Sequence, residues 1–202
     1  AVDVARRELH DAHCDLLAMM VNRAEPDDVD AVRTAVRPGA SGRPVYVMPE
    51  LNEISQPSMS EVAKALGARQ VAGSSSLERD VVGIKVAAMT VGNFISQLEH
   101  GNLVIAPSDR ADVMVAGLAS AVSPEFPVPS GMVLTGGLPI DAGILALLSQ
   151  APFPVFAVDD DTYTAARKVS RVRGEIASGQ RRKVAAALGV WTRHVDEQEL
   201  LE

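Results

Sequence analysis

Short apolar runs alternate with amphipathic helical patterns along most of this chain. The runs that we interpret as buried strands are Leu16–Val21, Pro44–Met48, Val81–Met89, Leu103–Ala106, Met132–Leu134 and Val155–Val158. Helix-forming residues or helix start signals fill Val4–His13, 25–36, Ser58–Leu66, Thr90–Glu99, Asp109–Val122, Pro139–Ser149 and Asp161–Arg173. Strands separated by single helices need crossover connections. The pattern therefore predicts an α/β fold with mainly parallel sheets and helices on both faces.

The same pattern predicts two small three-layer modules. Between them, Val71–Asp80 combines a flexible Ala-Gly-Ser-Ser-Ser run with charged residues, which is typical of a boundary. We predict a first domain over residues 1–70, a second over 71–174, and a charged helical connector over 175–202. No strand precedes the helix at Val4, so we expect the first domain to be part of a longer one.

Composition and charge restrict the class of partner. The chain has 202 residues, with 47% hydrophobic and 22% charged residues, as in a folded globular protein. A formal net charge of −7 argues against nucleic acid, because phosphate binding needs a basic face. The single cysteine, Cys14, excludes an intramolecular disulfide and favours a reducing compartment. We see no signal peptide and no membrane-length apolar run, so we expect a cytoplasmic protein.

Small and polar residues follow two consecutive predicted strands. The carboxyl ends of parallel strands share one edge, where open α/β sheets bind ligands. We expect Arg110 to pair there with a small anion, and the N–H groups of Gly136 and Gly137 to donate to it. Ordinary helix capping and tight turns are the alternative. The candidate ligand-binding residues are Asp109, Arg110, Asp112, Thr135, Gly136 and Gly137.

Two other groups have the residue types of metal ligands. His10, His13 and Cys14 fall on one face of a predicted helix, yet a surface helix with a packed thiol explains them better. Asp159–Asp161 would suit Mg²⁺, but capping of the next helix by Asp161 is the preferred interpretation. Neither a phosphate-binding loop, a G-x-G-x-x-G motif nor a serine nucleophile elbow occurs. We therefore predict no metal, no cofactor and no catalytic residue.

The second half resembles the DRTGG domain family, on Asp109-Arg110 and Thr135-Gly136-Gly137. The runs Val86–Met89, Leu103–Ile105 and Pro154–Phe156 extend the resemblance. It implies an α/β domain that assembles into a homo-oligomer.

The first half resembles the C-terminal part of a dethiobiotin-synthetase-like P-loop domain. The strand ending in Val21-Asn22-Arg23 and the later Val47-Met48-Pro49 carry this resemblance. In that superfamily the Asn at this position can contact a nucleotide base, which implies such a contact for Asn22.

The two domains in this order resemble the N-terminal region of long-form bacterial phosphate acetyltransferases. That resemblance implies a non-catalytic regulatory and assembly region, covalently linked to a catalytic domain that interconverts acetyl-CoA and phosphate with acetyl phosphate and CoA. It also implies a small metabolite effector such as NADH, pyruvate or phosphoenolpyruvate. A purely structural dimerisation module without ligand is the main alternative. A stand-alone acyltransferase fits less well. A dethiobiotin-type synthetase fits least, since the ATP-binding loop is absent.

Overall fold

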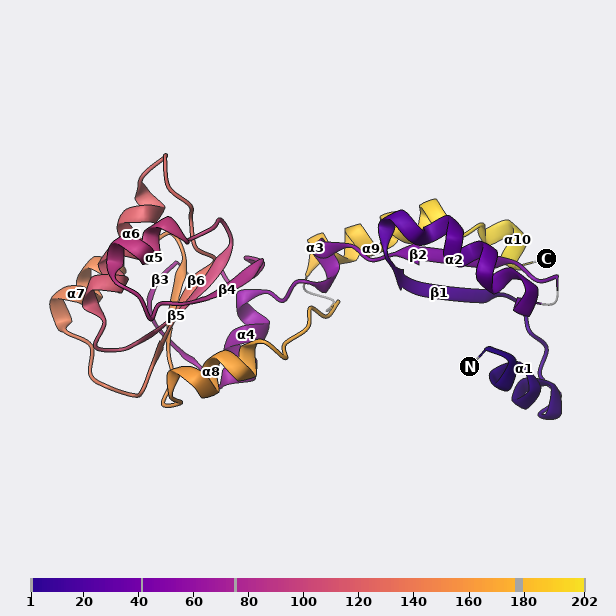
Figure 1. Ribbon diagram of the computed structural model, residues 1–202, viewed down its shortest axis with the longest axis horizontal. Coiled ribbons are helices and arrows are strands. Elements are labelled where there is room, and N and C mark those ends of the chain that lie inside the picture. Colours follow the sequence, from indigo (N-terminus) through magenta and orange to yellow (C-terminus); the bar gives the residue numbers. More distant parts are fainter. Residues whose placement is uncertain (1, 41, 75, 177–179, 202) are drawn as a thin grey trace. The chain divides into compact units, whose positions relative to one another are not determined.

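Two compact units make up the chain in the computed structural model, which describes residues 2–40, 42–74, 76–176 and 180–201 (Figure 1). Unit 1 comprises Ala1–Ser55 and Ile176–Glu202, and unit 2 comprises Gln56–Glu175. Each unit has its own sheet.

The boundary between the units differs from the predicted one. It lies after Ser55, and not at residue 70, because the segment that follows is built into unit 2. Helix α4 (Met59–Leu66) packs on α8 (Thr162–Val169). Strand β3 (Arg69–Gly73) pairs with β7 (Pro154–Ala157). The run that we predicted to be flexible therefore begins within a strand, and its Ser75 lies outside the described residues.

Unit 1 contains a two-stranded parallel sheet of β1 (Met19–Ala24) and β2 (Val45–Pro49). Strand β1 starts three residues later than predicted, since Met19 pairs with Val45 in the register of β2. The helices are α1 (Val2–Asp11), α2 (Val29–Val36), α3 (Asn52–Ser55), α9 (Arg181–His194) and α10 (Glu197–Leu201), with 3₁₀ turns at Pro26–Asp28 and Arg37–Ala40.

The C-terminal helices belong to unit 1 and do not form the separate connector that we predicted. Helix α9 packs against β2. The hydroxyl of Tyr46 donates to the Asp196 carbonyl at 3.1 Å and to Glu199 Oε2 at 3.0 Å. Burial, together with the nearby Glu199 carboxylate, raises the pKa of Tyr46 to about 12. The charged Glu199 side chain thus helps to attach the tail to the sheet. Residues 177–179, at the start of the predicted connector, lie outside the described residues.

Unit 2 is a five-stranded sheet in the order β3-β7-β6-β5-β4. Its remaining elements are β4 (Gly83–Val86), α5 (Val91–Ser96), β5 (Asn102–Pro107), α6 (Ala111–Val122), β6 (Gly131–Thr135) and α7 (Ala142–Leu148). Strands β4 to β7 pair in parallel, and β3 is antiparallel at one edge. This confirms the predicted α/β class with a mainly parallel sheet.

Both faces of this sheet are buried. In β5, Val104 and Ala106 face a core that α5, α6 and α7 cover. Leu103 and Ile105 alternate with them and face a second core under α4 and α8. A period of two with apolar side chains at every position is what burial on both faces requires. Figure 1 shows these helix layers on the two sides of the unit 2 sheet.

Local sequence signals explain where several helices begin. Ser58 Oγ accepts from the Glu61 N–H at 3.3 Å, and Glu61 Oε2 accepts from the Ser58 N–H at 2.6 Å. This is a capping box. Asp161 caps α8 as predicted, because its Oδ1 accepts from the Thr164 N–H at 2.9 Å.

Within the described residues no helix is long and apolar enough to cross a membrane.

Candidate functional site

The ends of β5 and β6 lie side by side, as the pattern predicted, with Pro107 opposite Thr135. Ser108 crosses this edge: its N–H and its hydroxyl both donate to the Thr135 carbonyl, at 2.9 and 2.8 Å. The buried Thr135 hydroxyl in turn contacts the Ala106 carbonyl and, at 2.7 Å, the hydroxyl of Thr162 at the start of α8. The carboxyl edge of the sheet is therefore tied together by hydrogen bonds from three successive strand ends.

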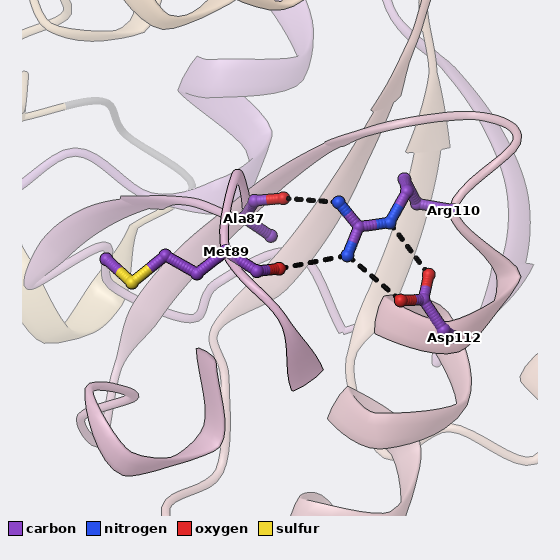
Figure 2. A network of polar contacts seen from close by, with 4 residues as sticks. All are labelled: Ala87, Met89, Arg110 and Asp112. Atoms are coloured by element: carbon purple, nitrogen blue, oxygen red, sulfur yellow. Dashed lines mark hydrogen bonds and ion pairs between the residues drawn. The ribbon is translucent and has the colours of Figure 1, made fainter. Parts of the chain in front are cut away.

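Arg110 braces the loop after β4 against the first turn of α6 (Figure 2). Its Nε and Nη2 donate to the two carboxylate oxygens of Asp112 at 2.8 and 2.9 Å. Its Nη1 and Nη2 reach the carbonyls of Ala87 at 3.2 Å and Met89 at 3.0 Å. The hydrogen bond from Arg110 lowers the pKa of the Asp112 carboxyl and raises the pKa of Arg110 itself. Four of the five guanidinium donors are thus engaged within the protein.

Gly136 and Gly137 connect the loop after β6 to the loop after β7. Both have left-handed backbone, with φ of +88° and +62°, a region that favours glycine. The Gly136 N–H donates to the Asp160 carbonyl at 2.8 Å, and the Gly137 N–H to the Val158 carbonyl at 3.2 Å.

These contacts engage the groups that we expected to bind a small anion. The donors meant for the anion, on Arg110, Gly136 and Gly137, are already bonded to protein oxygens. Asp109 does not cap α6 either, because that helix begins at Ala111 with Arg110 at the N-cap position. In this structure Arg110, Asp112, Thr135, Gly136 and Gly137 hydrogen-bond within the loops of the carboxyl edge.

The predicted metal-ligand groups do not form a site. Helix α1 ends at Asp11, and His13 has a φ of +58°, so His13 and Cys14 leave the helical face of His10. Asp160 Oδ2 pairs with Lys168 Nζ at 2.7 Å, and Asp161 is the helix cap. Across the described ranges no cluster of three or more His, Cys, Asp or Glu side chains is suited to a metal ion.

The connections after β6 and β7 leave the sheet toward opposite faces. The chain runs from β6 to α7 over one core and from β7 to α8 over the other. Neighbouring strands whose connections diverge in this way leave a crevice outside their carboxyl ends, where α/β proteins bind ligands.

A cavity of about 440 Å³ opens at this point. Its lining comes from the three strand-end loops, α7 and the segment around β3: Gly67, Arg69, Val71, Ser108, Gly137, Leu138, Pro139, Ile140, Leu145, Ala157, Val158 and Asp159. Of the predicted ligand residues only Gly137 lines it. Arg69 was not among the predicted site residues, since β3 was not predicted and its last three residues fall in the segment interpreted as a domain boundary. The short apolar pair Val71-Ala72 between Gly67 and Gly73 is the strand signal that could have found it.

The fold and this edge define an α/β domain with a ligand-sized cavity at the divergence of its connections. The sequence profile of the DRTGG domain matches residues 61–172. The chain belongs to the DRTGG domain family. Its five signature letters are Asp109-Arg110 and Thr135-Gly136-Gly137. Of these, Arg110, Thr135, Gly136 and Gly137 hydrogen-bond within the loops.

Relatives extend this assignment. The chain is 38% identical over 159 residues to the phosphate acetyltransferase of Nitratidesulfovibrio vulgaris, covering 77% of this chain and 23% of that protein. The phosphate acetyltransferase of a Synechocystis species is 20% identical over 205 residues, covering 99% and 29%. That of Pseudomonas putida is 29% identical over 152 residues, covering 74% and 22%. Part of the chain is thus homologous to phosphate acetyltransferases, and it spans between 22% and 29% of their lengths.

Among solved structures, the chain resembles the CBS and DRTGG domains of the regulatory region of Clostridium perfringens pyrophosphatase, complexed with its activator diadenosine tetraphosphate. The TM-score is 0.47 at 18% identity, covering 94% of this chain and 82% of that one.

Proposed function

We propose that this chain is the regulatory and assembly region of a bacterial phosphate acetyltransferase that acts in the cytoplasm. The observation that supports this most is the 38% identity over 159 residues to one such enzyme, confined to 23% of its length. The reaction of the whole protein, acetyl transfer between CoA and phosphate, then belongs to a covalently linked domain. Because no catalytic residue is assigned in this chain, we expect it to be inactive alone.

The cavity at the carboxyl edge of unit 2 is our proposed effector site. Its volume of about 440 Å³ lies in the range typical of small-molecule sites. Five of the residues that we first predicted as ligands, Arg110, Asp112, Thr135, Gly136 and Gly137, hydrogen-bond within the loops at this edge. An effector bound there alters activity only if its affinity differs between two conformations of the protein.

Unit 1 is proposed to derive from a dethiobiotin-synthetase-like domain. In support, Asn22 lies near the carboxyl end of the parallel strand β1, and its side chain is exposed. Arg23 and Glu50, from the two strand ends, approach at 3.6 Å. If Asn22 contacts a nucleotide base, Asn22→Ala weakens nucleotide binding to the chain in a calorimetric titration with ATP. Equal heats from the two proteins would contradict the contact.

A structural dimerisation module is the second candidate, and one observation favours it. Strand β4 is an edge of the unit 2 sheet, and Val82, Ile84 and Val86 along it are 58%, 37% and 39% exposed. An apolar edge strand with open backbone groups can pair with a second copy. A stable dimer in light scattering, without any effector response, would favour this role.

The decisive experiment uses the longer phosphate acetyltransferase to which we propose this segment belongs. Acetyl-CoA formation from acetyl phosphate and CoA is measured with and without NADH, pyruvate or phosphoenolpyruvate. We expect deletion of this segment to remove the effector response, and the isolated chain to transfer no acetyl group. Acetyl transfer by the isolated chain, or an unchanged response after deletion, would overturn the proposal.

A further inference from the structure

We propose that the cavity of unit 2 binds a zwitterionic 2-amino acid with an apolar side chain. Its carboxylate pairs with Arg69 and its ammonium group with Asp159. The inference rests on the proposed regulatory function and names the ligand class of that site.

One cation and one anion face the cavity, and both are unpaired. Arg69 and Asp159 line it, and over the described parts of the chain neither side chain makes a hydrogen bond or ion pair. Arg69 lies opposite Ala157 in the β3–β7 pair, and Asp159 follows two residues later. The two charges therefore reach the same carboxyl edge from neighbouring strands without neutralising each other.

Gly137 makes the room for the Asp159 carboxylate. A Cβ at Gly137 would lie 2.9 Å from Asp159 Oδ1, closer than side chains tolerate. The carboxylate thus rests against a bare backbone, beside the cavity that both residues line. The hydrogen bond from the Gly137 N–H to the Val158 carbonyl holds the two loops together beside this carboxylate.

Additional polar groups suit the two ends of an amino acid. The Ser108 hydroxyl donates to the Thr135 carbonyl at 2.8 Å, so its lone pairs can accept from an ammonium group. The N–H groups of Leu138 and Ile140 have no acceptor within the described residues, so they are available to a carboxylate.

The rest of the lining is apolar. Val71, Leu138, Ile140 and Leu145 contribute to the cavity wall. A branched aliphatic side chain would be removed from water against these groups, which favours binding. Leucine is therefore the probe that matches the charges and the wall together.

Charge balance distinguishes this ligand from simple anions. A zwitterion satisfies Arg69 and Asp159 at once. A dianion such as inorganic phosphate would meet the Asp159 carboxylate as a like charge, in a chain of net charge −7, and would fill little of the 440 Å³. Asp159 is exposed, and a like-charge contact with it still disfavours a bound dianion.

The test is a calorimetric titration of the whole 202-residue chain with three matched ligands. These are L-leucine, 4-methylpentanoate, which lacks the ammonium group, and 3-methylbutylamine, which lacks the carboxylate. Arg69 and Asp159 are both exposed, so we expect L-leucine to bind and each analogue to bind about two- to fivefold more weakly, the effect of one exposed ion pair.

Protein variants locate each charge. Asp159→Asn is expected to weaken L-leucine about two- to fivefold and to leave 4-methylpentanoate unweakened. Arg69→Gln is expected to weaken both carboxylates and to leave 3-methylbutylamine unchanged. Arg167→Gln on α8 and Glu99→Gln are the matched controls, because both side chains are exposed and neither lines the cavity. Thermal unfolding of every variant checks that it is folded.

Each outcome decides a separate point. If L-leucine gives no binding heat at concentrations up to about 10 mM, any remaining affinity is too weak to count as recognition. That result overturns the site. If inorganic phosphate or AMP binds more tightly than L-leucine, and Arg69→Gln weakens that binding, the proposed ligand class is overturned. L-leucine bound by the chain, with no change in acetyl transfer by the longer protein, overturns the regulatory function and supports the site.

Discussion

Gly73→Ala is expected to destabilise unit 2 by about 2–5 kcal/mol, the sum of left-handed backbone strain and overpacking. Gly73 has a φ of +79°, and a Cβ there would lie 2.1 Å from the Phe153 carbonyl oxygen. That oxygen belongs to the backbone and cannot rotate away. Gly73 also pairs with Pro154 at the end of the β3–β7 ladder, so relief of the clash requires β3 to move off the sheet.

Urea unfolding measures this loss, and Gly136→Ala is the matched control. Gly136 has a φ of +88°, and a Cβ added there would meet no atom of the described residues within 4 Å. It therefore reports backbone strain alone, about 1–2 kcal/mol. Because β3 carries Arg69, we also expect Gly73→Ala to weaken L-leucine binding. Equal destabilisation by the two substitutions would show that β3 yields without cost and would contradict this account.

Most of unit 2 could be predicted because its elements have local signals. The buried strands β5, β6 and β7 are apolar at nearly every position, and Ser58 with Glu61 has the spacing of a capping box. Strand β3 could not be predicted from a local pattern. It is held by antiparallel pairing with a strand more than eighty residues later, and its Gly-Ser end has the composition of a linker. Missing β3 displaced the predicted domain boundary and hid Arg69.

The predicted site residues follow two strands that end side by side, and their donors bond to oxygens of the protein. Parallel strands end at one edge, so the sequence could place Arg110 and Gly136 there. It could not show which acceptors these donors find. Arg110 bonds the carbonyls of Ala87 and Met89, more than twenty residues earlier in the chain, and no residue type at those positions signals a backbone acceptor. A sequence also does not show whether a charged side chain is paired. The unpaired state of Arg69 and of Asp159 therefore emerged only from the structure.

The brace formed by Arg110 and Asp112 on the loop after β4 provides the second large prediction. Arg110→Ala removes four hydrogen bonds and leaves the Ala87 and Met89 carbonyls and the Asp112 carboxylate without their donor. The Arg110 side chain is 28% exposed, so water replaces part of what is lost. We expect unit 2 to lose about 1–3 kcal/mol, the range for a partly buried, charge-assisted group. Arg110→Lys keeps the charge but not the two-pronged geometry, and is expected to recover little of this stability.

The pH dependence separates the brace from general loosening of the loop. The pKa of Asp112 is lowered by the hydrogen bond from Arg110, so the folded state holds this carboxyl ionised more strongly than the unfolded chain does. Its stabilising contribution is present above the ordinary carboxyl pKa and is lost as pH falls through the lower, folded-state pKa. The wild-type protein should therefore lose more stability than Arg110→Ala between about pH 5 and about pH 2.

Urea unfolding across that range measures the difference between the two proteins. The pKa of Asp161 is also lowered, chiefly by the Thr164 N–H, and this contribution remains in both proteins because α8 keeps its cap. The difference between their pH curves consequently isolates Asp112. Parallel curves would mean that the guanidinium does not hold the Asp112 carboxylate, and that Arg110 acts on the loop by packing and by its bonds to the Ala87 and Met89 carbonyls.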